Sequence, residues 1–210
     1  MIKVLIVDDH PLIREGMKQI LLADRDIVVA GEASTASELM EILNKGKFDL
    51  VLLDIALPDS GGLDLLKRIK TEFPHLPALV LSMYKEEEYA IRALRAGAAG
   101  YIVKETAPTQ LVAAIRKAVS GGKHISPLLA EQLATTMESG FKETPHQSLS
   151  DRELQILLMI GSGKTPTEIA EELSLSIKTI STYRTRILEK MRMENTSQLM
   201  HYVLKHNLLM

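Results

Sequence analysis

The stretch Phe48-Asp-Leu-Val-Leu-Leu-Asp-Ile-Ala-Leu-Pro58 decides the fold, because its apolar run is unbroken and ends on a carboxylate. Val51, Leu52 and Leu53 need burial on both faces, which is typical of a central strand in a parallel sheet covered by helices on each side. Asp54 then lies where this strand leaves the sheet. In doubly wound sheets the binding crevice lies beyond the carboxyl ends of the strands, so we expect Asp54 to serve chemistry rather than packing.

Short apolar runs alternate with amphipathic segments around this stretch. Strands are predicted at 2–7, 27–31, 50–53, 78–81 and 101–103. Helices are predicted after each of them: one begins near Pro11, one is capped by Ser34 or Thr35, and three more cover 63–73, 86–97 and 108–121. Five such units predict a doubly wound α/β domain with a five-stranded parallel sheet. Right-handed crossovers would bring the ends of strands one, three and five together on one edge.

Polar groups stand at the ends of four predicted strands. Asp8 and Asp9 end the first, Asp54 ends the third, Ser82 ends the fourth, and Lys104 follows the fifth. Three converging carboxylates repel one another unless a cation lies among them, and Mg²⁺ is a hard divalent ion that takes oxygen ligands together with phosphate. With Lys104 and Ser82, these carboxylates predict a site at which a phosphoryl group is transferred onto Asp54.

Each of these residues also has a simpler explanation when taken alone. A strand-end aspartate such as Asp54 is more often a turn former, and Tyr101 alone is core packing with its hydroxyl at the rim. His10 is expected to flank a helix start beside Pro11 rather than to bind metal. The order of these residues at the ends of the right strands favours the chemical interpretation.

The composition limits the class of protein. The chain has 210 residues, 46% of them hydrophobic, a net charge of -2 and no cysteine. A disulfide framework and a thiolate metal site are therefore excluded. No signal peptide and no apolar run of roughly 20 residues is recognisable, so we expect a soluble protein of the cytoplasm that has no membrane partner.

The second half predicts a separate helical domain. We expect a first domain at 1–121, a linker at 122–147 that contains a helix with Leu129, Leu133 and Met137, and a second domain at 148–210. In the second domain, helices are predicted after a capping box that begins at Ser150, at 166–173, from Ile177 to about Met193, and at 196–205. The four-residue turn at 174–177 makes a helix-turn-helix.

Positive charge is concentrated on the helix that follows this turn. Between 178 and 192 there is one acid, Glu189, against five basic residues, Lys178, Arg184, Arg186, Lys190 and Arg192. Such a helix suits insertion into the major groove of DNA and contact with flanking phosphates, although a solvated surface helix has a similar composition.

The motifs of the first half resemble the receiver domain of two-component response regulators. They are Asp8-Asp9, Asp54 in Asp-Ile-Ala-Leu-Pro with Gly62 after it, Ser82, and Gly-Tyr-Ile-Val-Lys at 100–104. The resemblance implies that Asp54 is the phosphoacceptor and that Lys104 contacts the phosphoryl group. It implies that Ser82 and Tyr101 form a switch pair. It also implies a Mg²⁺ site made by Asp8, Asp9, Asp54 and the backbone carbonyl of Ala56.

The second half is similar to the LuxR-type helix-turn-helix output domain. The similarity rests on Leu-Ser-Asp-Arg-Glu at 149–153, Glu-Ile-Ala at 168–170 and Lys-Thr-Ile at 178–180. A receiver followed by this output domain is the arrangement of the NarL/FixJ class. By position, the resemblance implies base-facing side chains at Ser181, Thr182 and Thr185. It implies phosphate contacts from Lys178, Thr179, Arg184 and Arg186.

The resulting hypothesis is a DNA-binding transcription regulator, not an enzyme, that a partner histidine kinase switches by phosphorylating Asp54. Its partners would be promoter half-sites in double-stranded DNA, and a second copy of the chain on phosphorylation or DNA binding. One alternative is a Mg²⁺-dependent phosphatase with Asp54 as nucleophile. Ala56 argues against it, because such enzymes often place a second acid two residues after the nucleophile. The other alternative is a regulator whose receiver domain binds a partner without being phosphorylated.

Overall fold

The computed structural model describes residues 1–57, 62–83, 86–131, 134 and 144–209, and the chain divides into two compact units, Met1–Leu133 and Ala134–Met210. The domain boundaries expected at 121 and 147 stay predictions. Of the predicted linker helix, residues 127–131 are helical and Leu129 is buried, whereas Leu133 and Met137 lie outside the described residues.

The first unit is built on a five-stranded parallel sheet with the strand order β2-β1-β3-β4-β5. The predicted parallel sheet is confirmed, and each strand lies within two residues of its expected bounds. They are β1 (Ile2–Val7), β2 (Ile27–Ala33), β3 (Leu50–Asp54), β4 (Ala78–Ser82) and β5 (Gly100–Val103). All carboxyl ends therefore meet at one edge, although β4 lies between β3 and β5.

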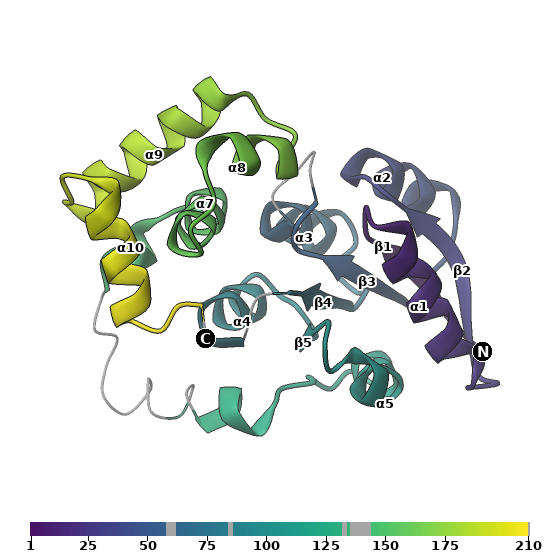
Figure 1. Ribbon diagram of the computed structural model, residues 1–210. Coiled ribbons are helices and arrows are strands. Elements are labelled where there is room, and N and C mark those ends of the chain that lie inside the picture. The colour runs from purple at the N-terminus through teal and green to yellow at the C-terminus, as the bar shows by residue number, and fades with distance from the viewer. Residues whose placement is uncertain (58–61, 84–85, 132–133, 135–143, 210) are drawn as a thin grey trace. The chain divides into compact units, whose positions relative to one another are not determined.

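Five helices cover the two faces of this sheet (Figure 1). They are α1 (Pro11–Leu22), α2 (Ala36–Lys45), α3 (Gly62–Glu72), α4 (Glu86–Arg95) and α5 (Ala107–Val119). Apolar side chains of α1 and α5 form one core with alternate residues of the strands, such as Leu50 and Leu52. The helices α2, α3 and α4 lie on the other face (Figure 1). Every residue of β3 is buried, as its apolar run requires.

Local caps explain where several helices begin. Of the two candidates before α2, Thr35 is the cap, since its hydroxyl accepts a hydrogen bond from the Glu38 N–H at 3.2 Å. Pro11 occupies the first turn of α1, where a missing N–H is tolerated, and His10 is the residue before it. The expectation that His10 flanks the helix start is confirmed.

Between residues 144 and 209, the second unit holds a short 3₁₀ helix and four α-helices. They are η1 (Pro145–Ser148), α7 (Asp151–Gly161), α8 (Pro166–Glu172), α9 (Ile177–Met191) and α10 (Thr196–Lys205). Ser150 and Thr165 begin α7 and α8 with capping boxes, and the Ser176 hydroxyl accepts from the Thr179 N–H at 3.0 Å at the start of α9. Helix α9 follows α8 after a short turn, which is the predicted helix-turn-helix.

Two features of this unit set how closely its helices pack. Ser174 in the turn has a left-handed φ of 51°, which allows the sharp change of direction between α8 and α9. A Cβ on Gly161 would lie 2.4 Å from the Val203 side chain, so glycine lets α7 and α10 approach each other. Among the helices of the described ranges, none is long and apolar enough to cross a membrane.

Candidate functional site

The carboxyl edge of the sheet gathers the charged residues that the sequence singled out. Asp54 ends β3, Asp8 and Asp9 follow β1, and Lys104 follows β5. The side chains of Asp8 and Asp54 are 0% and 1% exposed, and that of Lys104 is 8% exposed. Buried charges are stable only when they are paired, so their contacts define the site.

The ammonium group of Lys104 bridges two carboxylates. Its Nζ lies 2.7 Å from Asp54 Oδ2 and 2.8 Å from Asp8 Oδ2. The backbone N–H of Lys104 donates to the Ser82 carbonyl at 2.7 Å, which fixes the residue at the end of β4 as well. Lys104 thus reaches across β4, the strand that separates β5 from β3.

Backbone groups hold the carboxylates from the other side. The Ala56 N–H donates to Asp54 Oδ1 at 3.0 Å, and the His10 N–H donates to Asp8 Oδ1 at 2.8 Å. The start of α3 needs Gly62, because a Cβ there would lie 2.4 Å from the backbone of Ile55. The chain therefore passes very close to the residue that follows Asp54.

The local environment shifts the proton affinities of this pair. Burial raises the pKa of Asp54; Lys104 opposes this and the negative charge of Asp8 adds to it. Burial by itself would lower the pKa of Lys104, but the carboxylates of Asp54 and Asp8 outweigh it and raise this pKa above its ordinary value. Two carboxylates facing one ammonium explain the raised pKa of Lys104, and burial explains that of Asp54. The site keeps an excess of negative charge.

The donor set fits a divalent cation. Ligand atoms of Asp8, Asp9, His10 and Asp54 all lie within 4.8 Å of one another. Apart from the imidazole beside it, the buried Oδ1 of Asp9 has no hydrogen-bond donor among the described residues. Three carboxylates and one ammonium leave two negative charges, which match a divalent ion.

Ser82 and Tyr101 lie in the strands next to the site. Asp54 pairs in register with Leu81, so Ser82 is one residue further along β4, and Ser82 is fully buried. Tyr101 pairs with Val80 in the same strand and is 1% exposed. Both positions fit the expectation that the two residues respond to changes at Asp54, and this role stays a prediction.

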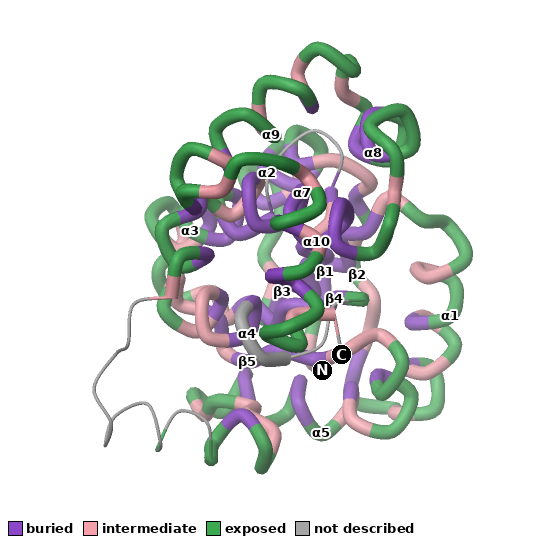
Figure 2. Tube along the Cα trace, turned by 60° about the vertical axis from the view of Figure 1, so that its left-hand side comes forward, coloured by how far each residue is buried: buried purple, intermediate pink, exposed green. Residues whose placement is uncertain are grey.

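The helix α9 of the second unit offers a surface of a different kind. Only Ile180, Ile187 and Met191 of its residues are buried, and most of its length is exposed (Figure 2). Among the described residues, Lys178, Arg184 and Arg186 form no ion pair. These cations are free to meet phosphates, as expected of a groove-binding helix.

The small polar residues of α9 differ in their exposure and in their hydrogen bonds. Ser181, Thr182 and Thr185 are exposed, and the hydroxyls of the two threonines donate to the carbonyls of Lys178 and Ser181 at 3.0 and 3.1 Å. Thr179 is half-buried, and its hydroxyl lies 2.8 Å from that of Ser176. Thr179 therefore helps to cap the helix, besides any contact with phosphate.

Sequence reasoning missed the partner of Lys190. Its Nζ lies 2.7 Å from Oε2 of Glu153, whose side chain is 4% exposed and which also closes the capping box of α7. Lys190 therefore fastens α9 to α7 and is not part of the free positive surface. The two residues are 37 positions apart, so no local pattern could have revealed the pair.

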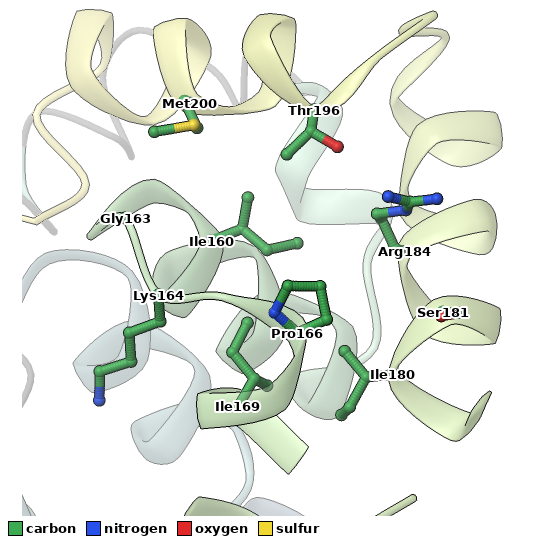
Figure 3. A pocket seen from close by; sticks show the side chains of 10 residues that line it. All are labelled: Ile160, Gly163, Lys164, Pro166, Ile169, Ile180, Ser181, Arg184, Thr196 and Met200. Carbon is green, nitrogen blue, oxygen red and sulfur yellow. The ribbon is translucent and has the colours of Figure 1, made fainter. Parts of the chain in front are cut away.

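A hollow of about 150 Å³ lies beside α9 (Figure 3). Its apolar lining includes Ile160, Ile169, Ile180 and Met200, from α7, α8, α9 and α10, and Ser181 and Arg184 of α9 also line it. Ile180 is buried on the inner side of the helix, whereas Ser181 and Arg184 are exposed residues at the edge of the hollow. Arg184, one of the unpaired cations of α9, therefore lies at the edge of this hollow.

The fold and the site define a class of protein. The first unit is a doubly wound α/β domain with acids and a lysine at its strand ends, and the second is a helical domain with an exposed basic helix-turn-helix. This is the architecture of a receiver domain joined to a helix-turn-helix output domain.

Comparison with known proteins identifies the family. The chain matches the response regulator receiver domain over residues 4–116 and the luxR family of bacterial regulatory proteins over residues 147–203. Response regulator UvrY of Escherichia coli (strain K12) is 38% identical over 209 residues, which cover 99% of this chain and 96% of UvrY. Response regulator GacA of Pseudomonas aeruginosa is 35% identical over 209 residues, covering 99% of this chain and 98% of GacA.

Solved structures agree with this result. RcsB of Salmonella enterica serovar Typhimurium, bound to promoter rprA in the presence of the phosphomimetic BeF₃⁻, matches with a TM-score of 0.65 and 28% identity, over 96% of this chain and 97% of RcsB. The chain therefore belongs to the two-component response regulators of the NarL/FixJ class, which join a receiver domain to a LuxR-type DNA-binding domain. This is a family of transcription regulators, not of enzymes, and the resemblance stated from the motifs is confirmed.

Proposed function

We propose that this response regulator is switched by a phosphoryl group that a histidine kinase transfers to Asp54 in the cytoplasm. The observation that carries the proposal is the bridging of Asp54 and Asp8 by Lys104, at 2.7 and 2.8 Å, on a buried strand edge. A carboxylate held in this way is positioned as a nucleophile, and the ammonium beside it offsets charge that develops on a phosphoryl group.

The transfer is a nucleophilic displacement at phosphorus. An oxygen of Asp54 attacks phosphorus, the bond between phosphorus and the kinase histidine nitrogen breaks, and the histidine keeps the electron pair. Lys104 then neutralises part of the charge on the phosphoryl oxygens. A Mg²⁺ ion held by Asp8, Asp9, Asp54 and the carbonyl of Ala56 would supply the remaining positive charge.

The switch would run through Ser82 and Tyr101. Ser82 follows the residue paired with Asp54, so its hydroxyl is suited to bind an oxygen of the new phosphoryl group. Tyr101 is fully enclosed in the present state, and a shift of Ser82 changes the space available to it. Phosphorylation would thereby favour a second packing of the receiver.

Intact-mass measurement tests the phosphorylation step. The full chain, incubated with acetyl phosphate and Mg²⁺, should gain the mass of one phosphoryl group, and Asp54→Asn should gain none. Asp64→Asn is the matched control, since Asp64 is an exposed aspartate paired with Lys67 on α3. An unchanged mass for the wild type, or phosphorylation of Asp54→Asn, would refute the proposal.

The output of the switch would be DNA binding by α9 as a homodimer. Ser181, Thr182 and Thr185 would face base edges, while Lys178, Thr179, Arg184 and Arg186 would mostly hold phosphates. The exposure of most of these side chains and the absence of ion pairs for the three cations within the described residues support this assignment. RcsB dimers bound to DNA are similar in structure, with 29% identity and a TM-score of 0.60.

Genome-wide mapping of bound DNA tests this output. Wild-type protein should occupy a defined set of promoters containing paired half-sites, and Asp54→Ala should occupy fewer of them. Sedimentation with an isolated promoter fragment should give two chains per paired site. Equal occupancy by wild type and Asp54→Ala would argue against phosphorylation as the control.

A further inference from the structure

The imidazole of His10 lies directly on the carboxylates of the metal site. Its Nδ1 is 2.8 Å from Asp9 Oδ1 and 3.3 Å from Asp8 Oδ1. The backbone N–H of His10 donates to the same Oδ1 of Asp8 at 2.8 Å, so the start of α1 holds the ring in this place. An ion pair with a protonated imidazole explains the distances; a nitrogen ligand to a shared metal ion explains them equally well.

The distances match the edges of a coordination octahedron. With metal–ligand bonds of about 2.1 Å, neighbouring ligand atoms are about 3.0 Å apart and opposite ones about 4.2 Å apart. The distances from His10 Nδ1 to Asp9 Oδ1 and to Asp8 Oδ1, 2.8 and 3.3 Å, lie on either side of the distance expected for neighbouring ligand atoms. All four residues offer ligand atoms within 4.8 Å of one another, close to the span of one ion.

His10 and Lys104 contact different oxygens of Asp8. Lys104 Nζ lies 2.8 Å from Oδ2, whereas both the N–H and the ring of His10 approach Oδ1. Lys104 therefore leaves Oδ1 of Asp8 and Oδ1 of Asp9 available beside the imidazole. The side chain of His10 is 64% exposed, so solvent ions reach this side of the site without rearrangement of the core.

We propose that His10 is a nitrogen ligand in this site and makes it selective for first-row transition ions over Mg²⁺. Mg²⁺ takes oxygen ligands and gains little from an imidazole, whereas Mn²⁺, Co²⁺, Ni²⁺ and Zn²⁺ accept imidazole readily, with affinity rising along that series up to nickel. The inference deepens the proposed function and rests on its metal site. A transition ion on His10 would compete with Mg²⁺ for the carboxylates beside Asp54.

Electron spin-echo modulation of bound Mn²⁺ reports the ligand directly. The full-length wild-type protein loaded with Mn²⁺ should show nitrogen modulation from a coordinated imidazole, and His10→Gln should bind Mn²⁺ without it. His75→Gln is the matched control, because His75 is an exposed histidine of the same unit outside the acidic cluster. Modulation that persists in His10→Gln, or that is missing in the wild type with Mn²⁺ bound, would overturn the proposal.

Titration calorimetry with Ni²⁺ and Mg²⁺ gives an independent measure. His10→Gln should weaken Ni²⁺ binding by about tenfold or more and change Mg²⁺ binding by less than about twofold. Equal effects on the two ions would overturn the selectivity. If neither Mn²⁺ nor Mg²⁺ binds the wild type, the metal site itself is refuted; if both bind and His10→Gln behaves as wild type, only the role of His10 is lost.

Discussion

The strand-end site and the helix α9 are both rich in charged side chains, but they differ in whether these side chains are buried and paired. At the strand ends the charged side chains of Asp8, Asp54 and Lys104 are almost fully buried and in contact, since Lys104 pairs with both carboxylates. On α9 the cations Lys178, Arg184 and Arg186 are exposed and unpaired among the described residues. The first arrangement fixes a geometry for chemistry, and the second leaves charge available for a large anionic partner.

The largest difference should appear when a lysine is removed from each kind of environment. Lys104→Ala leaves two buried carboxylates without a cation, so the free energy of unfolding should fall by about 3–5 kcal/mol. Lys45→Ala is the control: Lys45 and Glu41 form a surface pair with side chains 78% and 72% exposed, and it should change stability by less than about 1 kcal/mol. Urea unfolding in chelating buffer measures both. Similar losses for the two variants would contradict the comparison.

The next largest effect should come from Glu153, the buried acid beneath α9. Glu153→Ala removes a capping box and the partner of Lys190, and it should destabilise the second unit by about 2 kcal/mol. Burial acts to raise the pKa of Glu153, but the hydrogen bonds from Lys190 and Ser150 outweigh it and lower the pKa. The ionised Glu153 should therefore stabilise the wild type fully at pH values above the ordinary pKa of 4.5. This stabilisation should be lost as the pH falls through the lowered pKa of the folded state. The free energies of unfolding of the wild type and Glu153→Ala, measured across this pH range, check the prediction. A difference between them that does not change with pH would contradict the ion pair of Glu153 with Lys190.

The cations of α9 should affect binding without affecting stability. Lys178→Ala and Arg184→Ala should each weaken DNA binding by about tenfold and reduce the slope of log affinity against log salt by about one. Their unfolding midpoints should match the wild type. Lys190→Ala should behave in the reverse way, losing stability with little change in the salt slope. Fluorescence anisotropy with a labelled duplex measures the binding. Equal salt slopes for Lys178→Ala and wild type would remove Lys178 from the interface.

The smallest effect should be a gain of stability at the strand-end site. Because folding raises the pKa of Asp54, its ionised form is disfavoured in the folded state, and the neutral Asp54→Asn should be more stable by about 1 kcal/mol near neutral pH. The gain should be largest above the folded pKa of Asp54. It should disappear as pH falls below the ordinary value of 3.8, where Asp54 is neutral in both states. Thermal unfolding across this range measures it, and a loss of stability at neutral pH would show that the pair with Lys104 dominates.

Local patterns made much of this molecule predictable. The apolar run before Asp54 gave a buried central strand, and Ser150 with Glu153 gave the start of α7, because periodicity and capping depend only on near neighbours. The sequence also placed Lys104 at the end of the last strand. The distance between Lys104 and Asp54 could not be predicted, because β4 lies between β5, which precedes Lys104, and β3, which ends at Asp54.

What the sequence determined by itself is the set of elements and the order of chemical groups at their ends, since these follow from short-range preferences along the chain. The tertiary structure alone decided which charges meet. It joined Lys104 to two acids, Lys190 to Glu153, and the ring of His10 to the carboxylates of Asp8 and Asp9. Such contacts depend on side-chain direction and on helices packed across tens of residues. A pattern of near neighbours contains neither, and for this reason the sequence could not show which charged side chains are paired and which are free.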